Sequence, residues 1–182
     1  MSLRLEIIIG SVRQKRFGPV VSDWFTDKAR THGEFDVGVI DLADFDLPVD
    51  FSASESKDAF TARIGAADAF VAVTPEYNHG YPAALKTAFD SVKPEWKAKP
   101  IGFVSYGGLS GGLRAVEQLR LVAAEAHMVS IRETVSFHVA KERFDANGQT
   151  EDGAAIDAAA RLLDQLLWWA TALADKRASY PR

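Results

Sequence analysis

The feature that most constrains the fold of this 182-residue chain is the regular alternation of short apolar segments with helix-patterned ones. Buried strands are predicted at residues 3–9, 36–41, 69–74, 100–105 and 129–138. Several of these segments are too uniformly apolar to have a side facing water, which is typical of strands in a parallel sheet covered on both faces. The alternation therefore predicts an α/β protein.

The segments between these strands repeat their apolar residues at helical spacing. One such face consists of Phe17, Val20, Val21, Trp24 and Phe25. Pro19 and Pro82 are expected in the first turns of helices. Five strands and about five helices in this length suit a three-layer, doubly wound fold of flavodoxin type with a five-stranded parallel sheet, because each right-handed crossover lays its helix on one face of the sheet. We expect residues 1–182 to form a single domain.

Composition narrows the possible functions. The chain is 47% hydrophobic and 25% charged, and its net charge of -4 gives no reason to expect nucleic acid as a partner. No apolar run approaches the ~20 residues needed to cross a bilayer, so no membrane partner is expected. The chain contains no cysteine, which excludes disulfides and thiolate metal sites, and its four histidines lack metal-ligand spacing. A cytoplasmic location without a bound metal is expected.

The loop at residues 10–18 follows the first strand and reads Gly-Ser-Val-Arg-Gln-Lys-Arg-Phe-Gly. A phosphate there would meet the free N–H groups of the following helix, the Ser11 hydroxyl and the charges of Arg13 and Arg16. No Gly-Lys-Ser/Thr closes the loop, and it lacks the G-x-G-x-x-G spacing of a dinucleotide site. A monophosphate is therefore favoured over ATP or a dinucleotide, and a solvated basic turn is the alternative.

A second loop, residues 75–81, follows the third strand with the sequence Pro-Glu-Tyr-Asn-His-Gly-Tyr. Its backbone N–H groups and the Asn78 amide could bind the edge of a heterocycle while Tyr77 or Pro75 packs near the ring face. The alternative is a turn whose tyrosine only covers the core. Glu76 could act as a base, although an exposed or helix-capping carboxylate is favoured.

The third loop, residues 105–112, is rich in glycine, which would let the backbone approach a flat ring closely. Ser105 and Tyr106 would then line the other edge of that ring. Residues 108–112 also match the G-x-S-x-G nucleophile elbow, so a small serine hydrolase that uses Ser110 is an alternative. A flexible glycine turn without a ligand is a third interpretation.

Two further segments point to contacts outside the domain. The connection at residues 42–57 is acidic, contains Pro48 and is long for a strand-to-helix link, which favours a binding or interface loop. The last predicted helix, residues 153–176, has an apolar arc wide enough to cover more than its own sheet.

Taken together, Gly-Ser-Val-Arg at 10–13 with Arg-Phe-Gly-Pro at 16–19, Pro-Glu-Tyr-Asn at 75–78 with Pro-Ala-Ala-Leu-Lys at 82–86, and Ser-Tyr-Gly-Gly at 105–108 resemble the NAD(P)H-dependent FMN reductase family. This resemblance implies a flavodoxin-like fold, bound FMN, NADPH or NADH as co-substrate, and two-electron reduction of quinones, free flavin, azo compounds or metal oxyanions. It also implies a homodimer or homotetramer.

The same resemblance assigns cofactor-binding roles to particular residues. The FMN phosphate would be held by Ser11, Arg13, Arg16, Phe17 and Gly18. The isoalloxazine ring would be surrounded by Pro75, Glu76, Tyr77, Asn78, Tyr106, Gly107 and Gly108. Ser105 joins the predicted cofactor-binding residues from the third loop, as described above. Many family members carry a small hydroxyl residue where Arg16 stands, so Arg16 either replaces that contact with an ion pair or points outward to the nicotinamide cofactor's phosphate.

The predicted reaction needs no catalytic acid, base or nucleophile from the protein, because the flavin itself carries the hydride chemistry. The protein would orient two rings and stabilise the reduced flavin with N–H groups. The remaining alternative is a flavodoxin-like electron carrier that has the same fold and loops but no nicotinamide reaction of its own.

Overall fold

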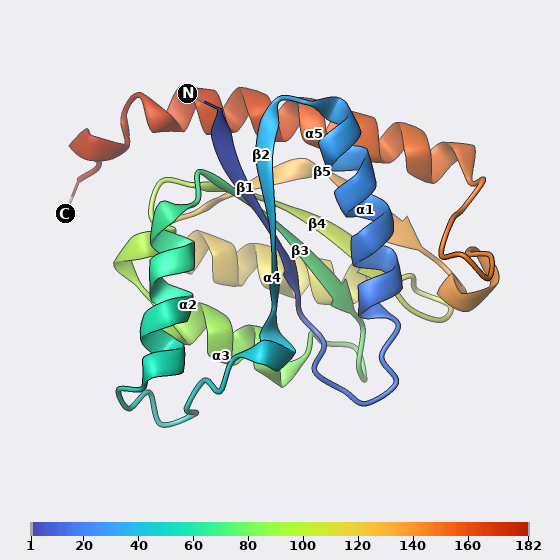
Figure 1. The fold of residues 1–182 in the computed structure, drawn as a ribbon, viewed down its shortest axis with the longest axis horizontal. Helices are drawn as coiled ribbons and strands as arrows, with labels where there is room; N and C mark the ends of the chain where they lie inside the picture. Colours follow the sequence, from blue (N-terminus) through green and yellow to red (C-terminus); the bar gives the residue numbers. More distant parts are fainter. Residues whose placement is uncertain (1, 182) are drawn as a thin grey trace.

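A computed structural model describes residues 2–181 as a five-stranded parallel sheet with helices on both faces (Figure 1). The strands are β1 (Leu3–Ile9), β2 (Phe35–Asp41), β3 (Ala69–Pro75), β4 (Pro100–Tyr106) and β5 (Val129–Phe137), in the order β2-β1-β3-β4-β5. This is the flavodoxin-like order, and it confirms the predicted fold class. β3 and β4 are buried along their whole length, as the apolar runs predict.

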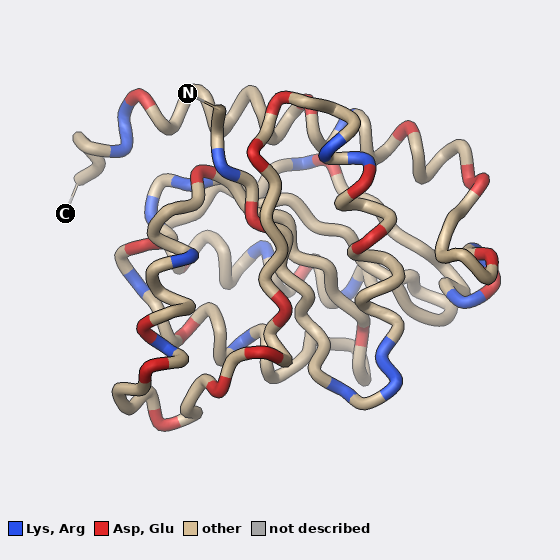
Figure 2. Tube along the Cα trace, viewed as in Figure 1, with Lys and Arg blue, Asp and Glu red and all other residues tan. Residues whose placement is uncertain are grey.

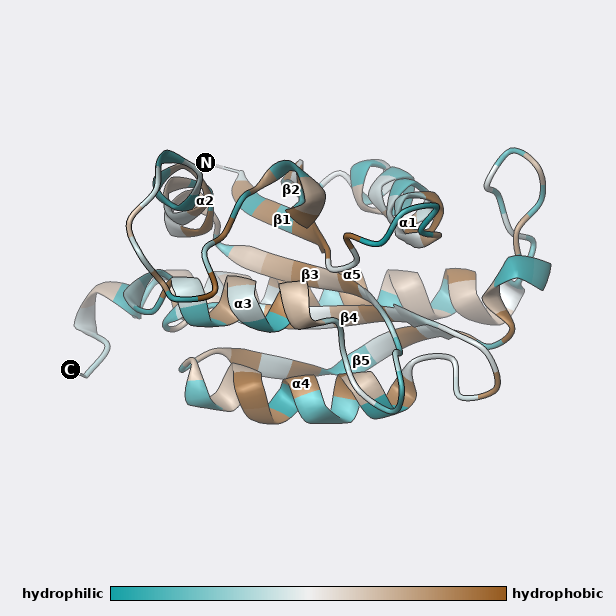
Figure 3. Cartoon of the chain, turned by 90° about the horizontal axis from the view of Figure 1, so that it is seen from below, coloured by the Kyte–Doolittle hydropathy of each residue, from teal (hydrophilic) through white to brown (hydrophobic). Residues whose placement is uncertain are grey.

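The five α-helices divide between the two faces of the sheet, which gives the three layers of Figure 3. They are α1 (Gly18–His32), α2 (Glu55–Ala66), α3 (Ala83–Ser91), α4 (Leu113–Glu125) and α5 (Gly153–Ala174). Helices α1 and α5 cover one face, and α2, α3 and α4 cover the other. Pro19 lies in the first turn of α1 as predicted, whereas Pro82 lies one position earlier, as the N-cap of α3.

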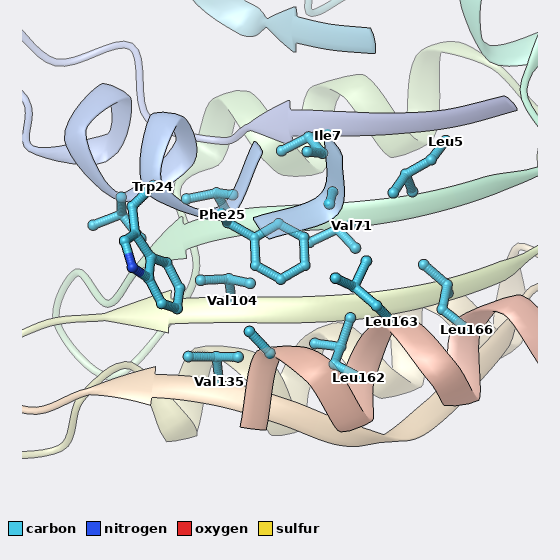
Figure 4. Close-up of a cluster of buried hydrophobic side chains, with 14 of the residues drawn as sticks. Leu5, Ile7, Trp24, Phe25, Val71, Val104, Val135, Leu162, Leu163 and Leu166 are labelled. Carbon is cyan, nitrogen blue, oxygen red and sulfur yellow. The ribbon is translucent and has the colours of Figure 1, made fainter. Parts of the chain in front are cut away.

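A close-packed apolar core joins α1 and α5 to the sheet. Figure 4 shows Trp24 and Phe25 of α1 and three leucines of α5 packing over valines from β3, β4 and β5. Trp24 and Phe25 are fully buried. Burying a large side chain completely is worth about 1.5–3 kcal/mol, so these contacts hold α1 against the sheet.

The strand order determines where a ligand can lie. Because all five strands are parallel, the loops that leave their carboxyl ends share one edge of the sheet. The chain leaves β1 toward β2 on one side and later returns to β3 on the other. This reversal opens a crevice between the loops after β1 and β3, the usual ligand site of such sheets.

The connection between β2 and α2 contains a short 3-10 helix, η1 (Leu42–Asp44), and ends at Ser54, whose hydroxyl accepts a hydrogen bond from the Lys57 N–H. Figure 2 shows acidic residues along this connection and basic residues in the neighbouring loop between β1 and α1. Among residues 2–181 no helix combines the length and apolarity that a membrane crossing requires.

A buried lysine at the opposite edge of the sheet makes stability depend on pH. Lys99 is 3% exposed and donates hydrogen bonds to the Ile64 and Gly65 carbonyls at the end of α2, at 2.8 and 3.0 Å. Burial lowers the pKa of its amine to about 8. Since an unfolded lysine keeps its proton up to about pH 10.5, the free energy of unfolding should rise as the pH increases from 8 toward 10.

We expect a gain of about 1 kcal/mol between pH 7.5 and 9.5, measured by urea unfolding at a series of pH values. In Lys99→Met this gain should disappear, whereas Lys93→Met, at an exposed lysine nearby, should keep it. Equal pH profiles for wild type and Lys99→Met would show that the Lys99 amine does not titrate in this range.

Candidate functional site

The loops after β1, β3 and β4 meet in one pocket of about 420 Å³, within the range of small-molecule sites. The Gly10 N–H donates to the Val73 carbonyl at 2.9 Å, and the Glu76 N–H donates to the Tyr106 carbonyl at 3.3 Å, so neighbouring loops are tied together at their bases. The pocket is lined by Arg13, Lys15, Arg16, Phe17, Pro75, Glu76, Tyr77, Tyr106, Gly107, Gly108, Val139, Ala140, Lys141 and Glu142.

The loop between β1 and α1 presents an uncapped helix N-terminus beside basic side chains. Phe17 is the N-cap of α1, and no side chain caps the first turn. Arg13 and Lys15 lie on the pocket wall next to it, in the basic loop of Figure 2. Free N–H groups and the positive end of the helix dipole favour an anion at this point.

Arg16 is already engaged with groups of the protein. Its guanidinium donates to the Ser11 carbonyl at 2.8 Å and forms an ion pair with Asp41, at the end of β2. Both side chains of the pair are less than one fifth exposed. Arg16 therefore braces the loop against the neighbouring strand, while Arg13 is left free to face a ligand.

The loop after β3 is a rigid two-residue hairpin. Tyr77 and Gly80 exchange two backbone hydrogen bonds of 2.8 and 3.0 Å, with Asn78 and His79 at positive φ between them. The Tyr77 hydroxyl lies 2.6 Å from the Ser11 hydroxyl, and the Arg13 guanidinium lies 5.8 Å from the centre of the Tyr77 ring. This tyrosine thus links the loop after β3 to the loop after β1.

Glu76 caps the neighbouring helix α4. Its side chain, 5% exposed, accepts hydrogen bonds from the Ser110 hydroxyl at 2.8 Å and the Arg114 N–H at 3.2 Å, and it forms an ion pair with the Arg114 guanidinium. Burial alone would raise the pKa of Glu76, but these bonds outweigh it and the pKa lies below its ordinary value. The carboxylate therefore stays charged at neutral pH and is poorly suited to act as a base.

The same contacts do not favour the serine hydrolase alternative. Ser110 donates its proton to Glu76 rather than to a histidine. His138 is hydrogen-bonded to the Leu109 carbonyl at 2.8 Å, and His127 to the Tyr180 hydroxyl at 3.0 Å. A nucleophile needs a base within hydrogen-bond reach, and neither histidine fills that role for Ser110.

The loop after β4 gives the pocket an open backbone floor. Ser105 is fully buried and donates to the Gly111 carbonyl at 2.8 Å, so it holds the loop from below. A side chain at Gly112 would collide with Ser105, whereas a Cβ at Gly108 would have no heavy atom within 4 Å. The space in front of Gly108 is therefore free for a ligand that approaches the backbone closely.

Tyr106 supplies an unsatisfied polar group under the pocket. Its ring packs edge-to-face against Phe17, and its buried hydroxyl has no hydrogen-bond partner among the described residues. Burial raises the pKa of this hydroxyl, so the group stays protonated and can donate. An orphaned donor, an uncapped helix N-terminus and an open glycine backbone in one pocket fit a phosphate joined to a flat ring.

Most of the predicted cofactor residues lie on the pocket wall. Ser11 is buried behind Tyr77, Gly18 begins α1 beside the Tyr106 hydroxyl, Asn78 is exposed in the hairpin and Ser105 lies below the wall. Lys15 and residues 139–142 also line the pocket, although the sequence did not predict them as site residues. The latter could have been found from the topology alone, because β5 ends at the same edge as the other strands.

A larger groove of about 610 Å³ lies between the last turns of α3 and α4, at the opposite edge of the sheet. Its wall includes Phe89, Val92 and Leu121 with several lysines. The residues that line this groove include no glycine and no uncapped helix N-terminus. We therefore assign the ligand site to the smaller pocket.

Comparison with known proteins supports this assignment. A family model described as NADPH-dependent FMN reductase matches residues 3–142, which include all three loops. The chain belongs to this family. The matched region also contains the Val139–Glu142 segment of the pocket wall and ends before α5.

Individual relatives agree with the family match. An NAD(P)H-dependent FMN reductase of Schizosaccharomyces pombe is 39% identical over 131 residues, which are 66% of this chain and 65% of the relative, slightly under two thirds of its length. A 2-hydroxy-1,4-benzoquinone reductase of a Burkholderia species is 30% identical over 133 residues, 70% of this chain and 69% of that one. The Paracoccus denitrificans flavoenzyme FerB shares the fold, with a TM-score of 0.75 over 93% of this chain and 98% of its own at 22% identity.

Proposed function

We propose that this protein is an FMN-dependent oxidoreductase that uses NADPH or NADH to reduce a small electrophilic acceptor, such as a quinone or a free flavin. The observation that carries the proposal is the convergence of an uncapped helix N-terminus and an open glycine backbone in one pocket at the β1–β3 crevice. The FMN reductase and benzoquinone reductase activities named for its relatives support the same chemistry.

In this proposal the loop after β1 holds the phosphate of FMN. Arg13 and the first N–H groups of α1 neutralise its charge, and the Tyr106 hydroxyl gains the acceptor that it lacks. The hydrogen bond between the Ser11 and Tyr77 hydroxyls and the ion pair between Arg16 and Asp41 hold this loop in position. Gly18 leaves room for the Tyr106 hydroxyl, because a Cβ at this position would lie 2.9 Å from it, and the Phe17 ring packs edge-to-face on the Tyr106 ring.

The loops after β3 and β4 hold the flat ring. Gly107 and Gly108 let the backbone approach one side, while Pro75 and Tyr77 border another. When bound, FMN accepts a hydride from the nicotinamide and passes it to the acceptor. The chain orients the two rings, and its backbone N–H groups stabilise negative charge on the flavin. Glu76 holds the loop in place through its ion pair with Arg114 and takes no part in the reaction.

The test is direct. Purified protein should be yellow or become so with FMN, and it should oxidise NADPH or NADH when a quinone is added. A preparation that gains no flavin absorbance would exclude the proposal. Stopped-flow mixing of the FMN-loaded protein with each nicotinamide separates it from an electron carrier, because the flavin of a carrier would stay oxidised.

The proposal also includes the cellular location and the oligomeric state of the protein. The cysteine-free sequence favours the cytoplasm. The exposed Trp168 on α5 and the long connection between β2 and α2 favour a homodimer or homotetramer. Sedimentation at micromolar concentration would measure the oligomeric state.

A further inference from the structure

The turn after β5 holds a valine in a backbone conformation that valine avoids. Val139 has φ 50° and ψ 49°, in the left-handed region where a β-branched side chain is strained. The residue is also 42% exposed, so burial of its isopropyl group does not explain the conformation. Strain of this kind persists only where the surroundings impose it, and it is concentrated at functional sites.

The surroundings of Val139 impose this conformation through the glycine loop. The Val139 N–H donates to the Gly108 carbonyl at 2.9 Å, and the Ala140 N–H donates to the Gly107 carbonyl at 3.0 Å. On either side of the turn, Phe137 and Phe144 pack against each other in the core, with ring centres 4.8 Å apart. The turn is therefore a rigid wall joined to the backbone that we assign to the flavin ring.

Val139 places an apolar side chain at the rim of the pocket. It is one of the pocket-lining residues, and its half-exposed side chain is apolar where its neighbours Lys141 and Glu142 are charged. The glycine backbone and the hairpin at Tyr77 already border the flavin in the proposed function. The apolar side chain of Val139 is therefore available to contact a second ligand, the electron acceptor, which enters the pocket after the flavin.

We propose that Val139 is a specificity-determining residue, whose strained backbone holds an apolar contact for the flat, hydrophobic acceptor that receives the hydride. This inference rests on the proposed function and adds the acceptor class to it: ring-substituted quinones should be favoured over small hydrophilic oxidants. Of the four residues of the turn that line the pocket, Val139 is the exposed apolar one, because Ala140 is buried and Lys141 and Glu142 are charged.

The test compares Val139→Asn with Phe51→Asn in FMN-loaded protein. Asparagine tolerates positive φ, so both changes should relieve strain and raise the melting temperature by about 2–4 °C. Phe51 is a matched control, because it has φ 61° and is 48% exposed but lies in the connection between β2 and α2, outside the pocket wall.

Only Val139→Asn should raise the Kd for 1,4-naphthoquinone, by about tenfold, measured by calorimetry with oxidised protein and no nicotinamide. The affinity for FMN should stay unchanged in both variants, and Phe51→Asn should also leave the reduction of ferricyanide unchanged. If Val139→Asn folds poorly, Val139→Gly keeps the turn and gives the same comparison.

An unchanged naphthoquinone Kd in Val139→Asn would overturn the inference, and so would a loss of FMN affinity, which would make Val139 part of the flavin site. Failure of the proposed function would look different: the wild-type protein itself would not oxidise either nicotinamide with any acceptor.

Discussion

Replacing Arg13 with alanine should weaken FMN binding by about 1.5–3 kcal/mol, or roughly 10- to 150-fold in Kd, the range for a hydrogen bond to a charged group. Arg13 lines the pocket beside the uncapped end of α1 and, unlike Arg16, has no ion-pair partner among the described residues. Riboflavin, which lacks the phosphate, should bind both proteins almost equally. Fluorescence titration with the two flavins measures the difference.

Arg30→Ala is the matched control, since Arg30 is an exposed arginine in the last turn of the same helix. It changes the net charge by the same amount but lies far from the proposed phosphate position, so FMN affinity should not change. If Arg13→Ala weakened riboflavin as much as FMN, Arg13 would contact the ring, and the orientation that we propose for the flavin would be wrong.

The largest loss of stability is expected from Gly112→Ala. Gly112 has φ 88°, and an added Cβ would lie 2.7 Å from the Ser105 Cβ and 3.0 Å from the Tyr106 N atom. Left-handed backbone strain costs about 1–2 kcal/mol and overpacking about 1–3 kcal/mol, so the free energy of unfolding should fall by about 2–5 kcal/mol. Urea unfolding of the flavin-free protein measures this loss.

Gly108→Ala is the control for this prediction. It tests whether the loss of stability in Gly112→Ala comes from the backbone strain and the collision at Gly112, rather than from replacing any glycine of the loop. Gly108 has no positive φ, and its Cβ would meet no heavy atom within 4 Å, so stability should change by less than about 0.5 kcal/mol. Its methyl group would instead enter the pocket and weaken FMN. Equal destabilisation by the two substitutions would contradict the conformation described for this loop.

The fold was predictable because the apolar pattern is strong along the whole chain. The five predicted strands agree with the observed ones to within one residue at each end, since buried parallel strands read as continuous apolar runs bounded by turns. The positions of the three loops followed from this. Parallel strands bring the residues after Ile9, Pro75 and Tyr106 to one edge, whatever the details of packing.

The details of the site were less predictable, because they depend on partners distant in the sequence. The pairing of Arg16 with Asp41 spans 25 residues, and the pairing of Glu76 with Arg114 spans 38. Neither is visible as local spacing. The turn at Val139 was missed because no glycine or polar-aromatic motif marks it. Its conformation is imposed by hydrogen bonds that its N–H groups donate to the Gly107 and Gly108 carbonyls.

A crystal structure of the protein grown with FMN would show directly where the flavin binds. We expect electron density for the phosphate at the first turn of α1 beside Arg13, and for the ring between Tyr77 and Gly108. Density for the flavin in the larger groove between α3 and α4, or with the phosphate and ring ends exchanged, would contradict it.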